Sequence, residues 1–98
     1  MNILIVGATS GIGKALYSHY ISYGNNVAIM GRRKSILDEL YAANPSKTFS
    51  AQTDISDVKS FNDAFNSIIK SLSTIDLAIV CASVGELNET LDISQELT

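Results

Sequence analysis

Seven residues near the start of the chain have the types and spacing of a phosphate-binding turn. The segment Gly7-Ala8-Thr9-Ser10-Gly11-Ile12-Gly13 follows an apolar run over residues 2–6 and precedes a helical pattern. In such a turn Gly7 lets the chain leave the strand sharply, Gly11 keeps the backbone open to a pyrophosphate, and Gly13 permits close packing of helix on strand. Glycine is common in any strand-to-helix turn, but the unpaired N–H groups and positive dipole of the helix end also attract anions. The segment therefore predicts a nucleotide-phosphate site.

A second candidate group follows the apolar run over residues 27–30. Gly31 occupies the position at which domains that prefer NAD carry an acidic residue for the ribose 2′-hydroxyl. Glycine leaves room for a 2′-phosphate, and Arg32 and Arg33 supply permanently charged, forked donors. The alternative is a solvated basic loop, although helix N-termini favour acidic residues. We expect NADP(H) to be preferred over NAD(H), with Arg32 at the phosphate and Arg33 stacked on the adenine edge or facing water.

The elements that position these groups alternate between strand and helix along the chain. This alternation predicts an α/β fold with a doubly wound parallel sheet, right-handed crossovers and strand order 3-2-1-4. Ligands bind such sheets at the carboxyl ends of the strands. The expected strands are 2–6, 27–30, 48–52 and 77–81, and the expected helices are 11–23, 35–43 and one that begins at Ser56 or Asp57 and ends near Leu72.

Helical spacing also predicts which side of the first helix packs on the sheet. The apolar face is expected to comprise Ile12, Ala15, Leu16, Tyr20 and Tyr23, with His19 on or beside it. Gly24 is expected to end that helix. Residues 83–98 are predicted to hold one short helix or to stay partly disordered.

Composition restricts the classes of protein to which the chain can belong. Its 98 residues suffice for one small domain, and 46% of them are hydrophobic. The net charge of −3 argues against nucleic acid or an acidic membrane surface as a partner. Cys81 is the sole cysteine, so no internal disulfide can form, and a reducing cytoplasmic setting is expected.

The spacing G-x-x-x-G-x-G, with Thr9-Ser10 inside it and Ile12 between the last two glycines, resembles the cofactor loop of the short-chain dehydrogenase/reductase family. That family binds NAD or NADP on a Rossmann fold. The resemblance implies that the Asp54 carboxylate accepts from the adenine amino group and that the Ile55 backbone N–H contacts the ring. Asp54 capping the third helix is the alternative. The cofactor-binding residues expected altogether are Gly7, Thr9, Ser10, Gly11, Ile12, Gly13, Arg32, Arg33, Asp54, Ile55, Ala82 and Ser83.

The end of the fourth predicted strand departs from the family pattern. The family has Asn-Asn-Ala-Gly there and this chain has Val80-Cys81-Ala82-Ser83, so only Ala82 is kept. The resemblance still implies that Ala82 and Ser83 line the cofactor. Cys81 is expected to be a small packing residue rather than a reactive thiol.

The family's catalytic pattern is missing from these 98 residues. Family members use Ser together with Tyr-x-x-x-Lys, in which tyrosine is the general acid/base. Residues four positions after the tyrosines are Ile21, Gly24, Val27 and Pro45. The resemblance therefore implies the N-terminal, cofactor-binding part of a longer oxidoreductase that transfers hydride between the cofactor and a carbonyl or hydroxyl group. By itself the chain is expected to be inactive.

Two other functions fit the same sequence. The chain could be a non-catalytic dinucleotide-binding module, or a remnant that binds no nucleotide and associates with itself. The predicted strand over residues 77–81 is apolar and would lie at an open sheet edge, which is a template for pairing with another chain. A homo-oligomer formed through this edge is therefore one expected assembly.

Overall fold

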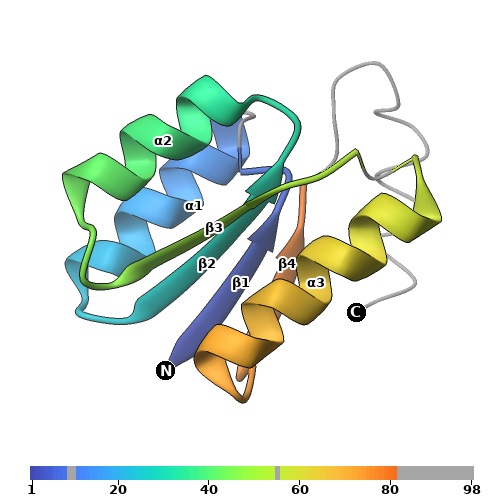
Figure 1. The fold of residues 1–98 in the computed structure, drawn as a ribbon. Helices are drawn as coiled ribbons and strands as arrows, with labels where there is room; N and C mark the ends of the chain where they lie inside the picture. Colours follow the sequence, from blue (N-terminus) through green and yellow to red (C-terminus); the bar gives the residue numbers. More distant parts are fainter. Residues whose placement is uncertain (9–10, 55, 82–98) are drawn as a thin grey trace.

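A computed structural model describes residues 1–8, 11–54 and 56–81 as a parallel sheet with helices on both faces (Figure 1). The strand order is β3-β2-β1-β4, which confirms the predicted α/β class and topology. The strands are β1 (Asn2–Val6), β2 (Asn26–Gly31), β3 (Thr48–Gln52) and β4 (Leu77–Val80), and the helices are α1 (Gly11–Ser22), α2 (Lys34–Ala43) and α3 (Val58–Leu72).

The predicted element bounds were close but not identical to those observed. β2 extends to Gly31, and α2 begins one residue early, at Lys34. α1 ends at Ser22, where the N–H of Gly24 donates to the Ile21 carbonyl at 3.1 Å. Gly24 has φ +82°, the left-handed conformation expected of a glycine that ends a helix.

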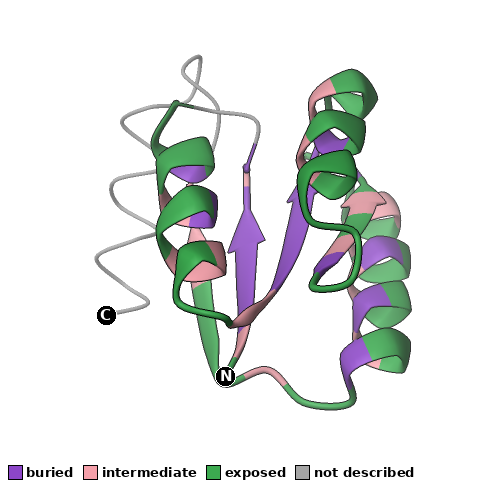
Figure 2. Ribbon diagram, turned by 90° about the vertical axis from the view of Figure 1, so that its left-hand side faces the viewer, coloured by how far each residue is buried: buried purple, intermediate pink, exposed green. Residues whose placement is uncertain are grey.

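The two central strands are buried because helices cover both of their faces (Figure 2). α1 and α2 lie on one face of the sheet and α3 lies on the other, as Figure 1 shows. Continuous apolar runs are typical of parallel strands covered on both sides. The core on the α1 and α2 face is made of Ile3, Ile5, Ala8, Tyr17, Val27, Ile29 and Leu37. The core on the α3 face is made of Leu4, Val6, Ala28, Met30, Ala64, Ile68 and Leu72.

The predicted packing face of α1 was partly correct, because Leu16 and Tyr20 pack against the core. The other predicted members, Ile12, Ala15 and Tyr23, are exposed. Ile12 and Tyr23 are 68% and 74% exposed, and His19 is exposed as well. The buried residues of α1 are Gly13 and Tyr17, with Leu16, Tyr20 and Ile21 packed beside them. Hydrophobic spacing alone could not fix this rotation, because the contact that sets it is made by a glycine.

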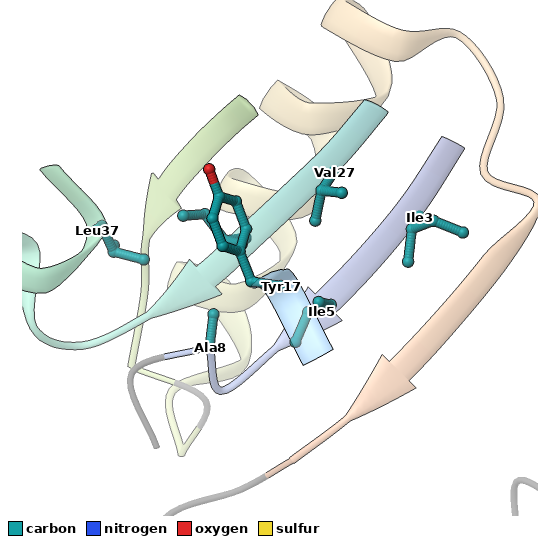
Figure 3. Packing of buried hydrophobic residues seen from close by; sticks show 7 residues of the cluster. Ile3, Ile5, Ala8, Tyr17, Val27 and Leu37 are labelled. Atoms are coloured by element: carbon teal, nitrogen blue, oxygen red, sulfur yellow. The ribbon is translucent and has the colours of Figure 1, made fainter. Parts of the chain in front are cut away.

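Tyr17 ties three elements together at the centre of this face. Its ring lies among the apolar core residues labelled in Figure 3. Its hydroxyl donates to the Leu40 carbonyl of α2 at 2.8 Å and lies 2.7 Å from Thr48 Oγ1 of β3. Thr48 is buried, so the tyrosine gives that hydroxyl the hydrogen bond it needs inside the core.

Asp57 is the residue that caps α3. Its carboxylate accepts hydrogen bonds from the backbone N–H groups of Lys59 at 3.0 Å and Ser60 at 3.3 Å. Of the two capping residues predicted, Asp57 is therefore correct and Ser56 is not. The alternative in which Asp54 caps the helix is also excluded, because Asp54 binds Ser56 in the preceding turn.

β4 is the least covered strand of the sheet. Within the described residues it pairs only with β1, from Ile3↔Leu77 to Val6↔Val80, and its other edge has no strand beside it. Leu77 is 37% exposed, Ala78 is exposed, and Ile79 and Val80 are half-buried. The expectation of an apolar strand at a sheet edge is met in this part of the chain.

Candidate functional site

The turn after β1 crosses the end of β2 at the carboxyl edge of the sheet. The backbone N–H groups of Gly7 and Ala8 both donate to the Met30 carbonyl, at 2.7 and 3.1 Å. Gly7 has φ +89°, a conformation that side-chain-bearing residues rarely adopt. A glycine is needed here so that the chain can bend over β2 and enter α1.

Gly11 and Gly13 have different surroundings although both lie in the first turn of α1. A Cβ added to Gly13 would be 2.5 Å from the Gly7 carbonyl oxygen and 2.6 Å from the Cα of Ala8. A Cβ added to Gly11 would meet none of the described atoms within 4 Å. Gly13 is thus required for packing, whereas Gly11 faces open space at the N-terminal end of a helix, where backbone N–H groups bind anions.

The end of β2 brings two cations next to a buried glycine. Gly31 is buried as the last residue of the strand, and Arg32 and Arg33 are both exposed. Arg33 precedes α2 without capping it through its side chain. Lys34 instead forms an ion pair with Asp38, one turn further along α2, at 3.0 Å. The two arginines therefore stand exposed at the carboxyl edge of the sheet.

Asp54 follows β3 at the same edge and is held in one orientation. The Ser56 hydroxyl donates to its Oδ1 at 2.6 Å, and the Ser56 backbone N–H donates to the same atom at 3.0 Å. These bonds, and then the positive charge of Arg32, hold the pKa of the Asp54 carboxyl below its usual value. The carboxylate is therefore ionised at neutral pH, and Oδ2 receives no hydrogen bond from any described residue.

Gln52 is a residue of this edge that the sequence pattern did not single out. Its side-chain Nε2 donates to the Arg32 carbonyl at 3.0 Å. Next to it, the Thr53 backbone N–H donates to the Gly31 carbonyl at 2.8 Å. No sequence signal marks such a bond, because it joins residues that are 20 positions apart and only the pairing of β2 with β3 brings them together.

Five of the predicted site residues lie outside the described part of the chain. They are Thr9, Ser10, Ile55, Ala82 and Ser83. Their assignment stays a prediction. Ile12 is described and exposed beside Gly11. Cys81 donates its backbone N–H to the Val6 carbonyl at 2.6 Å, and burial raises the pKa of its thiol, as expected for a packing residue.

A hollow of about 510 Å³ lies between α3 and β3, away from Gly11. Asp57 and Asp63 line it together with a single cation, Lys59. This charge does not suit a diphosphate. Across residues 1–8, 11–54 and 56–81 there is no cluster of three metal-ligating side chains, and no described helix is long and apolar enough to cross a membrane.

Comparison with known proteins identifies the family. The family model described as short chain dehydrogenase matches residues 1–98. An NAD-dependent glycerol dehydrogenase of Listeria innocua is 29% identical over 93 residues, covering 95% of this chain and 37% of that protein. The NADP-dependent 3-hydroxy acid dehydrogenase YdfG of Shigella flexneri is 29% identical over 79 residues, covering 81% of this chain and 32% of that protein.

Solved structures show the same likeness. A short chain dehydrogenase/reductase family oxidoreductase from Aeromonas hydrophila has a TM-score of 0.80 at 26% identity, covering 84% of this chain and 39% of that one. A closed form of serine dehydrogenase complexed with NADP⁺ has a TM-score of 0.74 at 28% identity, covering 80% of this chain and 32% of that one.

The fold and the sheet edge thus define a Rossmann-type protein with a glycine-rich turn. The chain belongs to the short chain dehydrogenase family. It contains the region in which oxidoreductases of this family bind their nicotinamide cofactor. The chain spans about a third of the length of the curated relatives it matches.

Proposed function

We propose that this chain is a single NAD(P)-binding Rossmann domain, the N-terminal part of a short-chain dehydrogenase/reductase that prefers NADP(H) to NAD(H). When bound, the nicotinamide cofactor would supply or accept the hydride exchanged with a carbonyl or hydroxyl substrate. None of the tyrosines in residues 1–98 is followed four positions later by a lysine, so the family's catalytic Tyr-x-x-x-Lys pattern does not occur in this sequence. Residues 1–98 alone would therefore bind cofactor without turnover.

The observation that carries the cofactor site is the open space at Gly11. That glycine lies at the N-terminal end of α1, and a side chain there would stand where no described atom lies within 4 Å. Backbone N–H groups at such a helix end bind a diphosphate. Asp54 supports the same site, because it is ionised and presents Oδ2 as an acceptor for an adenine amino group.

The preference for NADP(H) rests on the residues after β2. Because residue 31 is a glycine, the end of β2 carries no carboxylate that could bind a ribose 2′-hydroxyl or repel a 2′-phosphate. Arg32 and Arg33 are exposed, and neither forms an ion pair with a described residue. The relatives include NAD-dependent and NADP-dependent dehydrogenases, so family membership does not set the preference.

Calorimetric titration with NADP⁺ and NAD⁺ tests this preference. Wild-type protein should bind NADP⁺ more tightly. Arg32→Ala should weaken NADP⁺ by about tenfold or more, because hydrogen bonds to charged groups contribute about 1.5–3 kcal/mol. NAD⁺ affinity should be retained. Lys34→Ala removes the same charge two residues away and is the matched control, expected to leave both affinities unchanged.

Equal affinity for the two cofactors in wild-type protein and in Arg32→Ala would contradict the NADP(H) preference. No heat with either cofactor would contradict the cofactor site itself. That second result would favour the remnant that binds no nucleotide. Binding together with an open reading frame that lacks Tyr-x-x-x-Lys beyond Thr98 would favour the non-catalytic module.

We also propose that β4 mediates self-association when nothing else covers it. Leu77 and Ala78 are exposed, and no described strand covers the outer edge of β4, which supports this assembly. We further propose a cytoplasmic setting. The single cysteine of the chain is a partly buried free thiol, which suits a reducing compartment.

A further inference from the structure

The backbone between β2 and α2 is fixed at three successive carbonyl groups. The Gly31 carbonyl accepts from the Thr53 N–H at 2.8 Å, and the Arg33 carbonyl accepts from two N–H groups in the first turn of α2, both at 3.1 Å. Between them, the Arg32 carbonyl accepts from the side chain of Gln52 at 3.0 Å. This last bond alone is made by a side chain, so it can be removed without altering the backbone ladder.

Gln52 is well placed for this bond because of the sheet register. It is the last residue of β3, and its Cα pairs with that of Gly31. The alternation of side chains along a strand puts Gln52 on the same face as Thr48, which bonds to Tyr17 of α1. From that face the amide reaches past Gly31 to the following peptide group. Gln52 is itself exposed, so its removal leaves no hole in the core.

The side chain of Arg32 has no such restraint of its own. Among the described residues, its guanidinium forms no ion pair and no hydrogen bond that would hold it in one rotamer. Its charge is nevertheless close enough to Asp54 to lower the pKa of that carboxyl. Fixing the peptide group from which a long side chain departs reduces the entropy lost when that side chain binds a ligand.

We propose that Gln52 is a positioning residue for 2′-phosphate recognition, because its amide fixes the Arg32 peptide and thereby aims the guanidinium. This inference rests on the proposed function. It assigns to the end of β3 a role in cofactor discrimination, although Gln52 touches no part of the phosphate itself. A merely structural bond would instead contribute to folding and leave discrimination unchanged.

The test compares ligands that differ by one phosphate, 2′,5′-ADP and 5′-AMP, by calorimetry on the full chain. Gln52→Met keeps the side-chain length and removes the donor. Ser50→Ala is the matched control, since Ser50 is an exposed residue two positions earlier on the same face of β3. Gln52→Met should weaken 2′,5′-ADP by about three- to tenfold, in keeping with one lost hydrogen bond, and leave 5′-AMP within about twofold.

Nuclear magnetic resonance gives a second measurement that needs no ligand. The backbone order parameters of Arg32 and Arg33 should fall in Gln52→Met and stay unchanged in Ser50→Ala, with the same melting temperature in all three proteins. Unchanged order parameters would overturn the claim that Gln52 fixes this loop.

The two proposals fail in different ways. If wild-type protein binds 2′,5′-ADP no better than 5′-AMP, the NADP(H) preference fails and the recognition role of Gln52 fails with it. If wild-type protein discriminates and Gln52→Met discriminates equally well, the preference stands and only the role of Gln52 is overturned. An equal loss for both ligands also overturns it, because the bond would then act on the whole site.

Discussion

Two glycines of one helical turn illustrate how residues of the same type serve different purposes. Gly13 is in contact with the backbone of Gly7 and Ala8, whereas Gly11 faces open space. The sequence predicted both as parts of one phosphate-binding turn. In the structure, Gly13 is needed for close packing, whereas Gly11 is a candidate for ligand binding.

Replacement of each glycine by alanine should therefore change a different property of the protein. Gly13→Ala forces backbone atoms apart and should destabilise the fold by about 1–3 kcal/mol, a change of about 4–8 °C in melting temperature for each kcal/mol. Gly11→Ala should fold with an unchanged or slightly higher melting temperature, since alanine favours helix. Its affinity for NADP⁺ should fall by about tenfold or more, or about 1.4 kcal/mol.

Thermal denaturation followed by circular dichroism and calorimetric titration measure the two effects. Each variant is the control for the other. A Gly11→Ala protein with normal cofactor affinity would show that the space beside that residue does not receive a diphosphate.

At the scale of elements, the rotation of α1 about its axis depends on a contact that hydrophobic patterns do not record. Close approach of Gly13 to the turn after β1 brings Tyr17 onto the sheet and leaves Ile12 exposed. Tyr17 then joins α1 to α2 and β3 through its hydroxyl. The same packing keeps the N-terminal end of α1 at the carboxyl edge of the sheet.

Removal of the Tyr17 hydroxyl should show how much these hydrogen bonds contribute to stability. Tyr17→Phe leaves the buried Thr48 hydroxyl without its partner and should lower the free energy of unfolding by about 1–3 kcal/mol. The double variant Tyr17→Phe/Thr48→Val replaces both polar groups with apolar ones. Its loss of unfolding free energy should be smaller than the sum of the losses in the two single variants, with a coupling energy of about 0.5–3 kcal/mol.

Urea denaturation of the four proteins completes this double-mutant cycle. Strict additivity of the two changes would mean that the 2.7 Å contact between the hydroxyls contributes nothing to stability.

At the scale of the whole molecule, the sheet is asymmetric in how its edges are protected. The central strands β1 and β2 are buried, and β4 carries exposed apolar residues beside an edge that no described strand covers. Exposed strands of this kind pair with other chains. This asymmetry supports the proposed self-association through β4, which lies on the side of the sheet opposite to β3.

A lysine on β4 should suppress that association. Sedimentation velocity should show wild-type protein forming dimers or larger species as its concentration rises, and Leu77→Lys should remain monomeric because charged edge residues disfavour strand pairing. Tyr23→Lys is the control, because Tyr23 is an exposed apolar residue just after α1 and its replacement should not affect association. Wild-type protein that stays monomeric at every concentration would contradict the proposal.

Local sequence patterns were enough to predict the alternation of strands and helices, the strand order and the sheet edge at which the candidate residues gather. These follow from local patterns, since apolar runs of strand length and amphipathic stripes define the elements and connection rules define the topology. The sequence also placed Gly7, Gly11 and Gly13 in a strand–turn–helix context, because each glycine precedes or enters an element that the pattern marks clearly.

Three features became clear from the three-dimensional packing alone: which side of α1 faces the sheet, which residue caps α3, and how Gln52 holds the Arg32 peptide. The physical reason is that these outcomes depend on short contacts between specific atoms, often far apart in the chain. Periodicity records how apolar side chains recur. It does not record where a glycine permits two backbones to meet, or where a side-chain amide crosses from one strand end to the next.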